Sequence, residues 1–90
     1  MNTYVILLKL LTAPIDRYIG LFAYIKTAST WAKLSKSTWI IKTSRSASEI
    51  RDNISGKIGS RDSILVMKVS TNYWASNKIS KKITDWLKTL

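Results

Sequence analysis

The chain has 90 residues, 46% of them hydrophobic, and it carries 15 Lys and Arg against five Asp and Glu, for a net charge of +10. This length indicates one domain over residues 1–90, and the apolar share is too high for a disordered chain. Because the sequence contains no His and no Cys, it excludes a zinc site, a disulfide scaffold, a histidine general base and a cysteine nucleophile.

The longest apolar run is well short of the roughly 20 residues that a membrane span needs. The first residues also lack the basic region of a signal peptide. We therefore expect no membrane association, and a cytoplasmic location, which the absence of Cys also favours. The excess of positive charge attracts polyanions, namely nucleic acid, an acidic membrane or an acidic protein. The alternative is a basic surface without functional meaning.

The first half of the chain predicts a strand, a helix and a hairpin. Residues 4–10 are almost continuously apolar, which is typical of a central strand. Pro14 suits a first helical position, with Thr12 as a candidate cap, and the apolar spacing that follows predicts a helix over 14–27. Residues 30–34 and 37–43 are rich in Trp, Ile and Thr around a Ser-Lys-Ser turn, which predicts two paired strands.

The second half predicts a helix, a strand and a final helix. Ser46 precedes Glu49 by three residues, a capping-box spacing that begins a helix over 47–58. Residues 63–70 form the next strand, and 71–77 a loop or a short edge strand. The final helix carries an apolar stripe made of Ile79, Ile83, Trp86, Leu87 and Leu90. The order β-α-β-β-α-β followed by a helix is typical of an α+β, ferredoxin-like fold.

Alternation of side chains divides the sheet into two faces. We expect the first strand to lie parallel to the third and antiparallel to the fourth, with the wholly apolar set of side chains facing the helices. The other face then carries Lys9, Lys42 and Lys68, and Lys9 should lie beside Lys42 and favour an anion. The alternative is that each lysine extends its ammonium group into water over apolar neighbours. The apolar residues of this open face form the predicted dimer surface: Val5, Leu7, Ile40, Ile64 and Val66.

The segments "STWIIKT", "SASEIRDNI", "DSILVMKV" and "DWLKTL" fall between residues 37 and 90. In this order they resemble the SinR-like branch of the CRISPR-associated adaptation (Cas-two) superfamily. The resemblance implies a ferredoxin-like homodimer with packed sheets and a role connected with nucleic acid. Relatives in that superfamily include metal-dependent nucleases, interferase-like toxins and structural DNA-binding subunits.

The resemblance also implies where a nuclease would keep its metal ligand, an Asp near the end of the first strand. Leu8 or Lys9 stands at that place here, and neither side chain binds Mg²⁺. The first carboxylate of the chain is Asp16, which makes it a weak catalytic candidate, with Asp52 or Asp62 as further ligands. We therefore predict no metal site and no cofactor, with Mg²⁺ required only if the chain is a nuclease.

Two further groups of basic residues could contact phosphates. Arg45, Arg51, Lys57 and Arg61 lie around the second helix and its exit, although nearby Glu49 and Asp52 also fit a solvated helix face. The final helix carries Lys78, Lys81, Lys82 and Lys88, with Lys81 spaced to pair with Asp85. The aromatic residues Trp31, Tyr73 and Trp74 could stack on bases, or could be buried packing contacts.

Three functions follow from these patterns. The first is a non-catalytic, dimeric module that binds the backbone of DNA or RNA through Lys and Arg. The second is a divalent-metal-dependent endonuclease or endoribonuclease of the same fold, resembling an interferase-like toxin. The third is a protein-interaction module or inhibitor that binds an acidic or related partner subunit.

Overall fold

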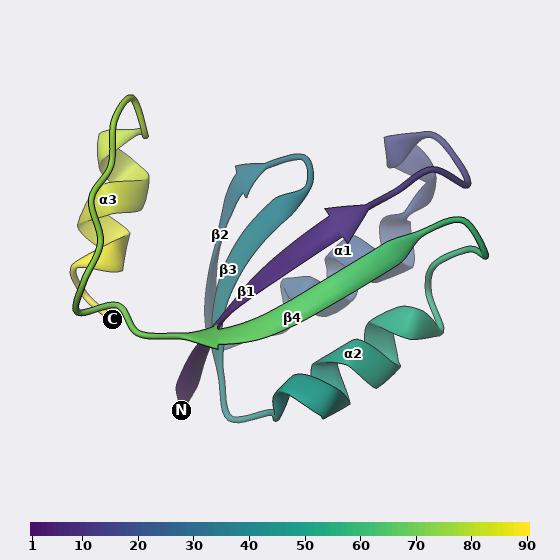
Figure 1. Ribbon diagram of the computed structural model, residues 1–90, viewed down its shortest axis with the longest axis horizontal. Helices are drawn as coiled ribbons and strands as arrows, with labels where there is room; N and C mark the ends of the chain where they lie inside the picture. The colour runs from purple at the N-terminus through teal and green to yellow at the C-terminus, as the bar shows by residue number, and fades with distance from the viewer.

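The computed structural model describes all 90 residues as an α+β protein with a four-stranded sheet (Figure 1). The strands and helices follow one another as β1 (Asn2–Lys9), the 3₁₀ helix η1 (Ile15–Arg17), α1 (Ile19–Ile25), β2 (Thr30–Ser35), β3 (Thr38–Thr43), α2 (Ala47–Ser55), β4 (Ser63–Val69) and α3 (Lys81–Leu87). No helix is both long enough and apolar enough to cross a lipid bilayer.

The sheet has the order β2-β3-β1-β4, and every neighbouring pair is antiparallel. The expected parallel pairing of the first and third strands is therefore wrong. The reason lies in the connections. The α1 crossover brings the chain back so that β2 runs in the direction of β1, and the tight turn at Lys36 and Ser37 then reverses β3. The observed order is compatible with a ferredoxin-like arrangement.

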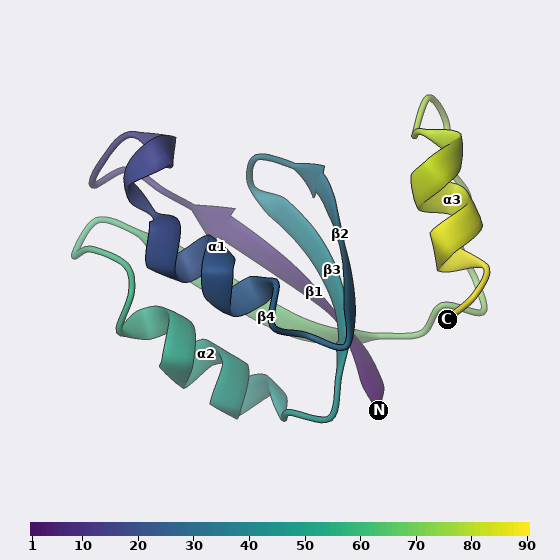
Figure 2. The ribbon, with the colours of Figure 1, turned by 180° about the vertical axis from the view of Figure 1, so that it is seen from behind.

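The core lies between one face of the sheet and the helices α1 and α2, which Figure 2 shows in front of the strands. Strand β1 contributes Tyr4, Ile6 and Leu8, and Trp39 is 1% exposed at the centre of the sheet. The helices contribute fully buried side chains at helical spacing. These are Leu21 and Ile25 on α1 and Ile50 and Ile54 on α2.

Helix α2 begins where the sequence predicts, because Ser46 caps it. The Ser46 hydroxyl accepts a hydrogen bond from the Glu49 amide at 3.1 Å, which satisfies one of the free N–H groups of the first turn. The helix ends at Ser55, three residues before the predicted end. The predicted helix over 14–27 is broken at Tyr18 into η1 and α1, and no side chain caps either start.

Asp62 joins three segments of the chain at the end of the sheet where β1 finishes. Its carboxylate accepts hydrogen bonds from the amides of Leu11 and Thr12 at 2.6 and 2.8 Å, and from the Gly59 amide at 2.7 Å. The Tyr18 hydroxyl donates to both carboxylate oxygens at 3.0 and 2.9 Å. This carboxylate therefore acts as a common acceptor for the β1–η1 loop, for Tyr18 at the start of α1 and for the α2–β4 turn.

The pKa of Asp62 follows from the same contacts. Desolvation of the carboxylate by itself would raise the pKa, but the donors outweigh it: the amides of Gly59, Thr12 and Leu11, and then the Tyr18 hydroxyl. Hydrogen bonds donated to a carboxylate favour its charged form. The pKa of Asp62 consequently lies well below the ordinary value of an aspartate.

Thr12 lies at this junction and does not cap a helix. Its hydroxyl accepts a hydrogen bond from the Arg61 amide at 3.2 Å, so it fastens the loop after β1 to the turn before β4. A Cβ atom added at Gly59 would clash with the Thr12 side chain. The close approach of these two loops thus requires glycine at this position.

Candidate nucleic-acid interface

The pair of lysines expected at one end of the open sheet face does not form. In the antiparallel register Lys42 lies opposite Thr3, near the start of β1, whereas Lys9 lies opposite Ser63 at the other end. The prediction that Lys9 and Lys42 form one anion site is therefore wrong. The two lysines are separated because β3 runs antiparallel to β1 and not parallel to it.

The faces of β4 are also exchanged relative to the prediction. Val66 lies opposite Ile6 and Ile64 opposite Leu8, so both point toward the helices and pack against the core. They do not belong to the open face. Leu65 and Met67 occupy it in their place, opposite Leu7 and Val5, and they are 52% and 48% exposed. Both faces of β4 carry apolar side chains, so only the pairing register with β1 shows which face points toward the helices.

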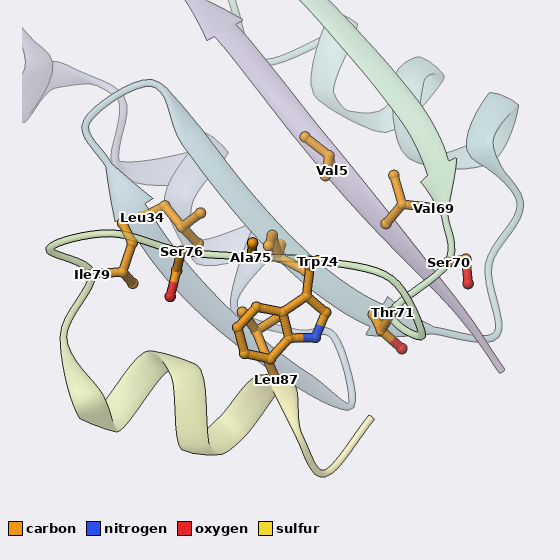
Figure 3. Close-up of a pocket in the computed structure, with 11 residues that line it drawn as sticks. Val5, Leu34, Val69, Ser70, Thr71, Trp74, Ala75, Ser76, Ile79 and Leu87 are labelled. Carbon is orange, nitrogen blue, oxygen red and sulfur yellow. The ribbon is translucent and has the colours of Figure 1, made fainter.

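Part of the predicted dimer surface is covered by the chain itself. The segment after β4 passes over Val5, as Figure 3 shows, and with Leu87 of α3 it borders an apolar cavity of about 250 Å³. Ile40 also lines this cavity. Ile40 is 9% exposed as a result. Trp74 and Ile79 line this cavity, so Trp74 is a packing residue here, whereas Tyr73 is 89% exposed. The uncovered apolar residues of the face are Leu7, Leu65 and Met67.

The four basic residues around α2 separate into three environments. Arg61 lies in the turn beside the end of β1. Arg51 is neutralised locally, because its guanidinium lies 2.9 Å from the carboxylate of Asp52. Arg45 and Lys57, which lie before and after α2, reach the same aromatic ring.

That ring belongs to Tyr24 of α1. The Arg45 guanidinium carbon and the Lys57 ammonium nitrogen each lie 5.0 Å from the ring centroid, within cation–π range. The Lys57 ammonium also donates to the Asn53 carbonyl at 3.1 Å. The Tyr24 hydroxyl and the Nη1 atom of Arg45 are buried and have no hydrogen-bond partner within the protein. We call Tyr24, Arg45 and Lys57 the Tyr24 cluster.

The charge of the Tyr24 cluster is not balanced by acidic side chains. The ion pairs of the structure are Arg51–Asp52 and Lys81–Asp85, the second of which confirms the predicted spacing on the last helix. Neither pair includes a member of the cluster. Two cations therefore lie over one aromatic ring between α1 and α2. Such groups are donors that suit the oxygens of an anion. The sequence predicted Arg45 and Lys57 as candidate phosphate contacts, but it did not indicate Tyr24.

The carboxylates do not gather. Asp16 lies exposed in η1, Asp52 pairs with Arg51 on α2, and Asp62 is occupied by the loop amides. No group of three Asp, Glu, His or Cys side chains is placed to hold a metal ion.

The fold and these contacts define a small basic α+β protein with a cationic cluster over its helical layer. Comparison with protein-family models, with curated proteins and with solved structures gave no match.

Proposed function

We propose that the protein is a non-catalytic module that binds the phosphate backbone of nucleic acid through the Tyr24 cluster. The observation that carries this proposal is the pair of cations, Arg45 and Lys57, which share one aromatic ring and have no carboxylate partner. The net charge of +10 supplies the long-range attraction for a polyanion. Ferredoxin-like topology and a relationship to structural, DNA-binding members of the Cas-two superfamily belong to the same proposal.

Backbone contacts predict a strong dependence of affinity on salt, because bound counterions are released from the nucleic acid. If roughly four phosphates are contacted, raising the salt from about 50 to 200 mM should weaken binding by about 100-fold. Fluorescence anisotropy with labelled DNA and RNA of mixed sequence measures this dependence. Absence of binding to both at low salt would reject the proposal, and co-purification of a stoichiometric acidic protein would then favour the interaction-module alternative.

We further propose that the module is a homodimer that pairs through Leu7, Leu65 and Met67. These side chains lie on the uncovered part of the open sheet face, and β4 has no neighbour on its outer edge. Contiguous exposed apolar side chains of this kind favour association with another surface. A second copy is the simplest partner, since most homo-oligomers are two-fold dimers.

The double substitution Leu65→Lys and Met67→Lys should convert the dimer to a monomer in sedimentation equilibrium. Ile19→Lys is the matched control. Ile19 is 75% exposed on α1, away from the open face, and its substitution should leave the dimer intact. A wild-type chain that sediments as a monomer at high concentration contradicts this part of the proposal.

A further inference from the structure

A second cavity, of about 390 Å³, lies between the edge strand β2 and the helix α3. Residues of β2 line one wall and residues of α3 the other. The lining consists of Trp31, Ala32, Lys33, Lys82, Ile83 and Trp86. Its volume falls in the range of about 300–1,000 Å³ that is typical of sites for small ligands.

Two indole rings in this cavity are held in place by their neighbours. Trp31 packs against Trp39 with ring centroids 5.5 Å apart, and Trp39 in turn stacks on Phe22 at 5.6 Å. Trp31 nevertheless remains 39% exposed. The Nε1 atom of Trp86 donates to the Thr30 hydroxyl at 2.6 Å, which fixes the second indole against β2. The aromatic surfaces are thus positioned before any ligand arrives.

The charged residues that line this cavity are both lysines. Lys33 and Lys82 line the cavity, and the Lys26 ammonium lies 5.3 Å from the centroid of the Trp31 ring. None of these lysines belongs to either ion pair of the structure. Aromatic side chains next to cations without an acidic partner suit a ligand that has a planar ring and a negatively charged group attached to it. A nucleobase with its adjoining phosphates has this chemistry.

We infer that the cavity takes a base of single-stranded nucleic acid, with the adjoining phosphates beside Lys33 and Lys82. This inference rests on the proposed function, since the same strand would supply the backbone for the Tyr24 cluster. It goes beyond that function, because the Tyr24 cluster would contact only phosphates, whereas the cavity would contact a base. Stacking is tolerant of sequence, so any base should fit.

The test compares two strands with the same number of phosphates. One is a ten-nucleotide oligothymidylate and the other is its abasic counterpart. The wild-type protein should bind the thymidylate strand about 5–100-fold more tightly, as base–aromatic stacking predicts. Trp31→Leu, which keeps apolar packing against Trp39, should abolish this difference. Trp74→Leu is the matched control, since Trp74 is also 39% exposed but lines the other cavity, and this variant should retain the difference.

The outcomes separate this inference from the proposed function. Equal affinity of the wild-type protein for the two strands overturns the cavity inference and leaves backbone binding standing. Failure to bind either strand at low salt overturns both. Photo-crosslinking of the wild-type protein to a strand that carries 4-thiothymidine requires no variant. Crosslinks should map to Trp31 or Trp86, and crosslinks confined to other regions contradict the inference.

Discussion

Replacing Asp62 with alanine should lower the melting temperature by about 5–10 °C, since each kcal/mol of lost stability shifts the melting temperature of a domain of this size by about 4–8 °C. The substitution removes the acceptor shared by the amides of Leu11, Thr12 and Gly59 and by the Tyr18 hydroxyl. Water can replace the carboxylate at the exposed amides of Leu11 and Thr12, whereas the partly buried Gly59 amide and Tyr18 hydroxyl would lose their partner. Thermal unfolding followed by circular dichroism measures the shift.

The control for this prediction is Asp16→Ala, which makes the same change of charge. Asp16 is exposed and accepts no hydrogen bond. The melting temperature of the Asp16→Ala variant should therefore stay within about 2 °C of the wild type, as is usual for surface substitutions. An equal and small effect of both substitutions would show that the Asp62 junction contributes little to stability.

The low pKa of Asp62 makes the stability of the folded protein depend on pH. In an unfolded chain the Asp62 carboxyl group has a pKa of about 4, whereas in the folded state it stays ionised at lower pH. Its contribution to stability is therefore present above about pH 4 and declines as the pH falls further. The difference in melting temperature between the wild type and Asp62→Asn should shrink progressively as the pH falls from about 5 to about 2. A difference that stays constant over this range contradicts the assignment.

The second prediction concerns binding. The double variant Arg45→Glu and Lys57→Glu should bind nucleic acid about 10–100-fold more weakly at low salt, because two charge-assisted contacts to phosphate become repulsive. The matched control is Lys36→Glu with Lys88→Glu, which produces the same net charge away from the Tyr24 cluster. Anisotropy titrations of both variants separate a local site from the general effect of net charge.

The control double variant should lose only a few-fold in affinity, and its salt dependence should stay close to that of the wild type. Equal losses in the two double variants would mean that the protein binds through its overall field, without a localised site. Circular dichroism of each variant should match the wild type, since all four side chains lie outside the core cluster.

Local patterns in the sequence predicted most of the secondary structure but not the way in which strands meet. Ser46 and the spacing of Ile50 and Ile54 determine α2 through contacts a few residues apart, and this prediction is confirmed. The placement of Lys9 and Lys42 depends on the direction of β3, which is set by the α1 crossover and a turn. Which side chains of β4 face the helices depends on its pairing register with β1, and the alternation of side chains along β4 does not determine that register.

The candidate sites were predictable only in part for the same reason. The sequence predicted Arg45 and Lys57 as two of four basic residues around the second helix, but their convergence on Tyr24 requires the packing of α1 against α2. The cavity between Trp31 and Trp86 unites residues 55 positions apart, because the segment after β4 carries α3 back to β2. Neither arrangement has a signature within a short window of sequence.

We propose that the Tyr24 cluster holds the phosphate backbone of the nucleic acid. An NMR titration of ¹⁵N-labelled protein with an unlabelled oligonucleotide tests it most directly, because it locates the contact residue by residue. The largest shift changes should fall on the Arg45 side-chain Nε–H and on the amides of Tyr24 and Lys57. Shift changes confined to residues outside the Tyr24 cluster, or no saturable change at low salt, would contradict it.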